Sequence, residues 1–287
     1  HKVIPHTHTH MNLRKLFWAA TAAALALAWT ATTSRSLAAD LTSQLGLQTW
    51  TLRNMNFEQA VAFAKKHGIT NLQVIGKHID PESPREEYLK KKAYLEANGL
   101  RAYTFGVAGT SLDKEKNRKL FTFAKDMGIQ LIIVEPPDFK ILDNLSELAR
   151  EYDIKVAIHN HGIRSLYGNP LVVRTLLKHL DPRVGVCMDA GWITSTGMDP
   201  TRIFKEYEGR VFDIHLKDKR VEKTQGDDVS FDTFIGEGQG NLANLLAELQ
   251  KTGWKGILAI ETDSGEFAKD PEQFVAKAKA FVAGATR

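Results

Sequence analysis

Five apolar segments of this chain end in polar side chains of the types that bind metals and transfer protons. In chain order they are Ile-Ile-Val-Glu135, Ala-Ile-His159-Asn160-His161, Val-Cys-Met-Asp189, Asp213-Ile-His215-Leu-Lys217-Asp218 and Leu-Ala-Ile-Glu261. If these ends meet at one place, each unpaired ionisable group buried there is energetically costly. A divalent cation is the simplest compensation.

Four of these residues together offer three carboxylates and one imidazole: Glu135, Asp189, His215 and Glu261. This hard donor set suits Mn²⁺, Mg²⁺ or Co²⁺, and Zn²⁺ is also a candidate. The alternative is that one or more of the carboxylates pairs with a lysine or an arginine. We expect one divalent metal ion, because the four groups end four different apolar segments in the same register.

From Gln44 onward, short apolar or β-branched segments alternate with longer segments of helical period, which is typical of βα units around a parallel sheet. We expect eight strands, at Leu45–Thr51, Asn71–Ile75, Arg101–Val107, Leu131–Glu135, Lys155–Asn160, Val184–Asp189, Val211–Lys217 and Ile257–Thr262. The expected helices are Phe57–Lys66, Pro84–Ala97, Asp113–Met127, Leu142–Tyr152, Pro170–Leu180, Pro200–Tyr207, Leu242–Lys251 and Pro271–Val282.

Glycines and the number of units support this pattern. Five glycines follow helical segments, where a left-handed residue is favoured: Gly68, Gly99, Gly128, Gly209 and Gly253. Eight units within residues 40–287 match the size of about 250 residues of a closed (β/α)8 TIM barrel. A doubly wound open sheet would need fewer strands and a glycine-rich turn after the first strand. We therefore predict an α/β fold, a single-domain (β/α)8 barrel over residues 40–287.

The N-terminal region has the pattern of an export signal. Residues 1–10 are interpreted as an extension upstream of a natural start at Met11, and residues 11–39 as a signal peptide with a basic start and an apolar core. The apolar core of about 14 residues is shorter than the roughly 20 that span a membrane. This predicts cleavage rather than a stable membrane anchor, and a periplasmic or secreted protein.

Charge and cysteine content narrow the classes of partner. Residues 1–39 hold four of the 38 basic residues and none of the 34 acidic ones, so the two kinds are equal in number in residues 40–287. Such a balance gives no electrostatic basis for binding nucleic acid. The single cysteine, Cys187, cannot form an internal disulfide, and we expect it to be a buried thiol.

Together, in this order and spacing, these motifs resemble the xylose isomerase-like TIM-barrel superfamily, in particular its sugar isomerases and 3-epimerases. The resemblance runs from Leu47-Gln48-Thr49-Trp50-Thr51-Leu52-Arg53 to Gly256-Ile-Leu-Ala-Ile-Glu261. It implies one divalent metal held by Glu135, Asp189, His215 and Glu261, with Glu135 and Glu261 also as the acid/base pair. The metal would polarise a sugar carbonyl while one carboxylate removes the proton on the adjacent carbon and the other returns one.

Two positions depart from the family pattern. Family epimerases usually carry a histidine three positions after the metal-binding aspartate, whereas this chain has Trp192 there. The second strand contains Gln73 and lacks a final carboxylate or histidine, which argues against a three-metal site of the DNA-repair endonuclease kind. The tryptophan disfavours a simple ketose epimerase.

Five residues near the predicted metal ligands are candidates for substrate binding: His159, His161, Lys217, Trp50 and Trp192. The two histidines should share one face of their strand, because side chains alternate. The alternatives are polar residues satisfied within a loop, a solvated lysine, and tryptophans that pack against neighbouring loops. After the seventh strand, a polar loop from Lys219 to Asn241 is long enough to close over a substrate. Its glycine-rich part follows no strand and lacks the Gly-Lys-Ser/Thr ending of a nucleotide loop.

The leading functional hypothesis is a metal-dependent isomerase or epimerase of an unphosphorylated sugar or glycoside, a small-molecule carbohydrate substrate. The alternative on the same fold is a 3-keto-glycoside lyase, in which proton removal beside the ketone expels the aglycone by β-elimination. A non-catalytic carbohydrate-binding barrel is the alternative from a different class. The sequence makes no prediction of oligomeric state.

Overall fold

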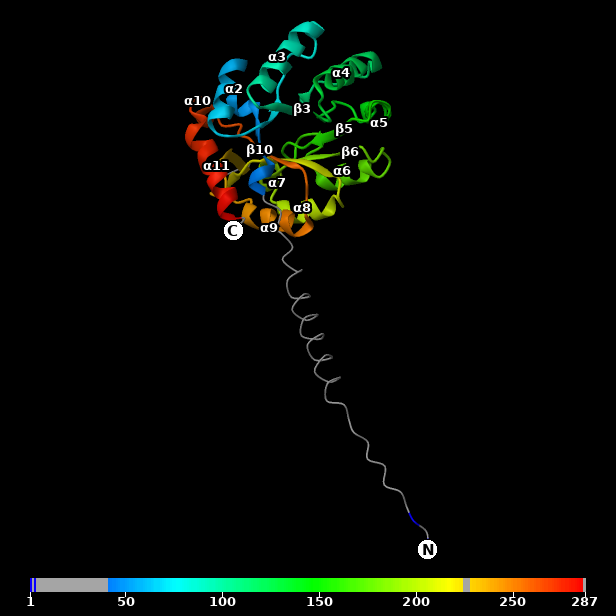
Figure 1. Cartoon of the computed structure of the whole chain (residues 1–287), viewed down its shortest axis with the longest axis vertical. Coiled ribbons are helices and arrows are strands. Elements are labelled where there is room, and N and C mark those ends of the chain that lie inside the picture. Colours follow the sequence, from blue (N-terminus) through cyan, green and yellow to red (C-terminus); the bar gives the residue numbers. More distant parts are fainter. Residues whose placement is uncertain (2, 4–40, 224–227, 286–287) are drawn as a thin grey trace. The chain divides into compact units, whose positions relative to one another are not determined.

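A computed structural model describes residues 1, 3, 41–223 and 228–285 (Figure 1). The predicted signal peptide and nearly all of the predicted extension lie outside the described residues, so these boundaries and the exported location stay predictions. Among the described helices, none combines the length and the apolar character that a membrane span requires.

Eight parallel strands close into a barrel with neighbours in the order β1-β10-β7-β6-β5-β4-β3-β2. The strands are β1 (Leu45–Gln48), β2 (Asn71–Val74), β3 (Arg101–Ala108), β4 (Leu131–Val134), β5 (Lys155–His159), β6 (Val184–Asp189), β7 (Val211–Leu216) and β10 (Ile257–Ile260). Each corresponds to one of the eight predicted strands. The predicted (β/α)8 TIM barrel is confirmed.

The outer layer consists of helices that follow the strands in turn (Figure 1). They are α2 (Phe57–Lys66), α3 (Arg85–Ala97), α4 (Lys114–Met127), α5 (Ile141–Tyr152), α6 (Pro170–Leu177), α8 (Pro200–Glu206), α9 (Leu242–Thr252) and α11 (Pro271–Ala285). The five glycines predicted to end helices all have positive φ angles, between 64° and 82°. A side chain at these positions would be strained, which explains the residue type.

The helices bury their apolar face against the barrel and expose their charged face, as the hydrophobic pattern predicts. In α5, Leu142, Leu145 and Leu148 are buried against the barrel, while Arg150 is exposed. Inside the barrel, Leu131, Ile133, Ala157 and Cys187 form a small apolar cluster. Burial of each such leucine side chain stabilises the folded state by about 1.5–3 kcal/mol. The barrel interior is therefore a packed core below the rim, and the predicted buried thiol is confirmed.

Several elements differ from the sequence prediction. The first strand ends at Gln48 rather than Thr51, because the Gln48 side chain accepts a hydrogen bond from the backbone of Trp50 and the chain turns into a 3₁₀ helix, η2 (Thr49–Leu52). Another 3₁₀ helix, η1 (Leu41–Gln44), precedes β1, and short helices α7 (Ala190–Ser195) and α10 (Gly265–Lys269) follow β6 and β10.

The segment predicted as a polar loop after β7 contains an antiparallel hairpin, β8 (Lys219–Lys223) and β9 (Asp228–Asp232). Asp232 anchors the hairpin. One of its carboxylate oxygens lies 2.6 Å from the Lys219 amine, and the other accepts hydrogen bonds from the Thr262 hydroxyl (2.7 Å) and the Asp263 backbone (2.6 Å). The hairpin is thereby tied to the segment that follows β10.

The glycine-rich segment 236–240 wraps around the carboxylate of Asp218. Backbone N–H groups of Gly236, Gly238 and Gly240 donate to it at 3.0, 2.9 and 3.1 Å, and that of Lys219 at 3.0 Å. A Cβ atom at Gly238 would lie 2.2 Å from a carboxylate oxygen, so only glycine fits there. These amides therefore bind the protein's own carboxylate, and the expectation that the segment is not a nucleotide loop stays a prediction.

Replacing Asp218 by asparagine should destabilise the protein, because an N–H₂ donor would then face backbone N–H donors. We expect the D218N variant to lose about 1–3 kcal/mol in free energy of unfolding, the cost of leaving buried donors without acceptors. Urea unfolding followed by circular dichroism measures this loss. The D143N variant at an exposed position is the control and should change by less than about 0.5 kcal/mol. Equal stability of the two variants would contradict this account.

Candidate metal and acid/base site

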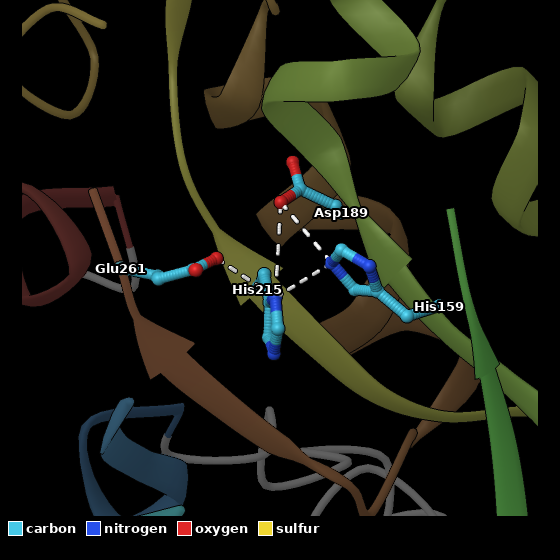
Figure 2. A group of neighbouring side chains, drawn as sticks. All are labelled: His159, Asp189, His215 and Glu261. Atoms are coloured by element: carbon cyan, nitrogen blue, oxygen red, sulfur yellow. Dashed lines mark hydrogen bonds and ion pairs between the residues drawn. The ribbon is translucent and has the colours of Figure 1, made fainter. Parts of the chain in front are cut away.

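Four buried side chains converge at the carboxyl rim of the barrel, and Figure 2 shows them pointing toward one another: His159, Asp189, His215 and Glu261. They come from β5, β6, β7 and the residue that follows β10. One ligand atom of each lies within 4.8 Å of those of the other three. This set is called the rim cluster below. Parallel strands of a barrel all end at the same rim, so residues distant in sequence meet there.

The distances within the rim cluster are short. His215 Nδ1 lies 2.8 Å from Glu261 Oε2 and 3.7 Å from Asp189 Oδ2. His159 Nε2 lies 3.1 Å from His215 Nδ1 and 3.6 Å from Asp189 Oδ2. Two nitrogen and two oxygen atoms thus surround a common space.

Glu135 belongs to a neighbouring group with His159 and His161 rather than to the rim cluster itself. Its Oε2 atom contacts His161 Nδ1 and lies 3.7 Å from His159 Nδ1. The rings of the two histidines are 4.6 Å apart, so their side chains lie on the same side as predicted, although His161 lies two residues beyond the end of β5. The structure therefore brings three of the four predicted ligands, Asp189, His215 and Glu261, together with His159. Glu135 lies on the other side of the His159 ring, near its Nδ1 atom. The ligand assignment itself stays a prediction.

Gln73, which sequence reasoning did not assign to the site, orients His215. The Gln73 amide nitrogen donates to the Gly106 carbonyl at 3.4 Å, and its oxygen then lies 2.9 Å from His215 Nε2. A ring nitrogen that donates to an amide carries the hydrogen, which leaves Nδ1 facing the carboxylates. In the sequence, only its position between apolar residues of a predicted strand sets Gln73 apart, and the structure buries it fully.

Three buried atoms at the site accept or donate no well-directed hydrogen bond among the described residues: Asp189 Oδ2, Glu261 Oε2 and His159 Nδ1. The two oxygens do lie within ion-pair distance of the Lys217 ammonium, at 2.9 and 3.1 Å. Buried polar atoms without a well-directed hydrogen bond are rare, and such atoms are open to a further ligand. Carboxylate oxygens and imidazole nitrogens are also the donors that Zn²⁺, Mn²⁺ and Co²⁺ accept. The residues present therefore fit a divalent metal ion.

Lys217 forms ion pairs with carboxylates of the site, as in the alternative in which a lysine compensates some of them. Its ammonium, 1% exposed, lies 2.7 Å from Asp263, 2.9 Å from Asp189 and 3.1 Å from Glu261. The stem fits because residue 191 is glycine, where a Cβ atom would lie 2.6 Å from Lys217 Cγ. One ammonium therefore faces three carboxylates, and Lys217 alone does not compensate them.

Electrostatic neighbours hold these groups in their charged forms. Burial raises the pKa of Glu135, but His159 and His161 lower it to about 2. Burial likewise raises the pKa of Glu261, but His215 and Lys217 lower it to about 2. Burial lowers the pKa of His215, yet Cys187, Glu261 and Asp189 raise it well above its usual value. In the metal-free protein, His215 therefore holds a proton among ionised carboxylates.

The two candidate tryptophans differ in position. Trp192 adjoins the site, with its ring 5.6 Å from that of His161 and the Lys219 amine 4.0 Å from the indole centroid. Trp50 is 42% exposed and lies under the Arg53 guanidinium at 4.8 Å. The predicted contacts of both tryptophans, of Lys217 and of the histidines with a substrate stay predictions.

Comparison with known proteins gives a consistent family match. Residues 50–283 match the xylose isomerase-like TIM barrel family. The chain is similar to an inosose dehydratase of Lacticaseibacillus casei, 24% identical over 217 residues and covering 70% of each chain. Its fold is similar to the crystal structure of the IolI protein with a bound zinc atom (TM-score 0.64, 17% identity, 85% and 98% of the two chains). Its fold is also similar to that of the probable 3-DHS dehydratase AsbF of Bacillus anthracis (TM-score 0.65, 14% identity, 83% and 98% of the two chains).

Replacing Gln73 by methionine should weaken metal binding, because His215 would lose the acceptor that fixes its tautomer and ring orientation. We expect the Q73M variant to bind Zn²⁺ or Mn²⁺ about 10–100-fold more weakly, as is typical for groups that orient metal ligands. Isothermal titration calorimetry measures the affinity, and circular dichroism reports the fold. The exposed Gln130→Met substitution is the control. Unchanged metal affinity in Q73M would show that Gln73 does not orient a ligand.

Metal binding should release a proton, because the raised pKa of His215 means that a cation must displace one from the metal-free site. The apparent affinity for Mn²⁺ should therefore rise with pH between about 6 and 8. Calorimetric titrations in two buffers of different ionisation enthalpy count the protons released. A constant affinity over this range, with no proton taken up by the buffer, would mean that His215 is not a ligand.

Proposed function

The chain belongs to the xylose isomerase-like TIM barrel family, and on this basis we propose that it is a metal-dependent lyase. It would remove the proton next to the ketone of a cyclic sugar or polyol and expel the oxygen substituent on the following carbon. The observation that carries the proposal is the convergence of His159, Asp189, His215 and Glu261, beside the Glu135–His161 pair, at one rim.

The sequence placed isomerisation or epimerisation first, and the lyase was its alternative. Relatives named inosose dehydratases, and a fold neighbour named a probable 3-DHS dehydratase, favour the alternative. Removal of the proton beside a carbonyl is common to all three reactions, which diverge only in the fate of the resulting anion. Trp192 at the position of the usual epimerase histidine is a further reason to prefer elimination.

A divalent metal held by Asp189, His215, Glu261 and either His159 or Glu135 would polarise the ketone when bound. Glu261 is ionised at neutral pH, which makes its carboxylate a proton acceptor. We assign it as the base. Lys217 supplies a fixed positive charge beside that base, where negative charge develops on the substrate.

We assign the Glu135–His161 pair to the leaving group. Elimination of an oxygen substituent requires a proton donor on the side where the carbon–oxygen bond breaks. His161 contacts Glu135, and its side chain is 41% exposed, whereas His159 is buried at 2%. A proton held between this carboxylate and this imidazole can therefore reach a substituent that faces the exterior.

The experiment is incubation of the metal-loaded protein in D₂O with an inosose and with a 3-keto-glucoside. Elimination forms an unsaturated ketone, followed by its ultraviolet absorbance, and we expect it from at least one substrate. The E261Q variant should lose about 10²–10⁴-fold in kcat, the contribution of a positioned base. Its metal content is measured alongside, because Glu261 is also a predicted ligand. The E266Q variant, at an exposed position five residues away, should keep the wild-type rate.

Two other outcomes would overturn the proposal. Incorporation of deuterium into an intact sugar, without loss of a substituent, would establish the isomerase or epimerase hypothesis. Absence of both exchange and elimination, together with binding of carbohydrate, would favour the non-catalytic barrel.

A further inference from the structure

A wide cleft of about 1200 Å³ opens next to the site. Its walls are the segment after β5, helix α7 with the start of α8, and the hairpin β8–β9. His161 and Trp192 belong both to this cleft and to the surroundings of the rim cluster. A ligand that reaches the rim cluster therefore has this space directly beside it.

The cleft is larger than a single sugar ring requires. Sites for drug-sized ligands occupy about 300–1,000 Å³. A substrate whose leaving group is water needs room only for the ring that carries the ketone. The volume beside His161 is therefore available for a second, larger part of the substrate.

The lining is mixed in polarity and suits an uncharged ring that carries hydroxyl groups. Ile163, Met198 and Val221 supply apolar surface. The hydroxyls of Ser195 and Thr196 donate to carbonyls of α7, so their oxygens remain acceptors toward the cleft. Charged side chains of both signs, Arg164, Lys223 and Asp199, also line it, and the lining therefore does not select a strongly charged ligand.

Trp192 supplies a second, independent observation. Its indole N–H is buried and has no hydrogen-bond partner among the described residues. A buried donor without an acceptor is a feature that a bound ligand oxygen would satisfy. The ring lies at the boundary between the cleft and the rim cluster, where the two parts of a substrate would join.

The cleft walls are held in place before any ligand binds. The Lys219 amine lies 4.0 Å from the Trp192 ring centroid and is itself 2.6 Å from Asp232. The indole also packs against Gly162. A Cβ atom at this position would lie 3.2 Å from two ring carbons, so the absence of a side chain leaves space for the ring. When a wall is already ordered, ligand binding does not cost the entropy of ordering its side chains.

From these observations we propose that the cleft binds the leaving group, and that the substrate is a keto-glycoside with a neutral ring, a second sugar or a phenol, as its aglycone. The proposal rests on the elimination proposed above. Glu261 takes the proton from the carbon between the ketone and the anomeric carbon, and a C=C bond forms there. The anomeric C–O bond breaks, and the oxygen leaves with a proton from the Glu135–His161 pair. The products are an unsaturated keto sugar and an alcohol or phenol, and no oxidant or reductant is needed.

The test compares 3-keto-glucosides that carry a methyl, a phenyl or a glucosyl group. We expect kcat/KM for the phenyl and glucosyl substrates to exceed that for the methyl substrate by at least roughly tenfold, the scale on which a pocket distinguishes substituents. Ser230 lines the cleft on β9, so S230W should lower the phenyl-to-methyl ratio by roughly tenfold or more. Val229 is 50% exposed and points to the opposite face of the same strand, which makes V229W the matched control with an unchanged ratio.

Equal kcat/KM for the three substrates, or a ratio that S230W leaves unchanged, would overturn the proposal. Binding of unreactive phenyl glucoside, measured by calorimetry with wild type, S230W and V229W, separates this proposal from the proposed reaction. If no substrate is eliminated but S230W alone weakens this binding, the elimination fails and the cleft remains a binding site. If the three proteins bind phenyl glucoside equally, the cleft assignment fails whatever the reaction.

Discussion

The negative charge of carboxylates buried where the strands of the barrel end is the constraint on which the rest of this structure depends. Asp189 and Glu261 are buried, and the Lys217 ammonium lies 2.9 and 3.1 Å from their carboxylates. Buried charges persist only when an opposite charge or a hydrogen bond compensates them. Without a metal, Lys217 and the proton on His215 compensate these carboxylates, and a divalent cation that displaces this proton would do so together with Lys217.

The scaffold around this charge is built to hold it in one arrangement. Gln73 fixes the ring of His215 from below, and glycine at position 191 admits the stem of Lys217. Asp218, which follows Lys217, accepts backbone hydrogen bonds from the glycine-rich segment 236–240. Asp232 connects the hairpin β8–β9 to the segment after β10. Because these contacts link successive rim segments, the cleft wall that includes Trp192 is positioned by the same residues that position the ionised groups.

Local patterns explain how much of this could be predicted from the sequence. The spacing of apolar residues and the glycines that end helices predict all eight strands and their helices. Because parallel strands of a barrel end at one rim, the same patterns also predict that Asp189, His215 and Glu261 meet there. That His159 rather than Glu135 completes the four-residue cluster depends on strand stagger and side-chain direction, which sequence spacing does not encode. The hairpin was missed because its segment is polar, and Gln73 because a lone glutamine has no motif.

The central claim is that one divalent ion sits among the carboxylates and imidazoles of the rim. Anomalous diffraction at the zinc edge, from crystals of the protein grown with Zn²⁺, tests it most directly. The account predicts one strong peak at about 2.0–2.2 Å from atoms of Asp189, His215 and Glu261. A map with no peak there, with the Lys217 ammonium among the same carboxylates and with full activity in the presence of a chelator, would contradict it.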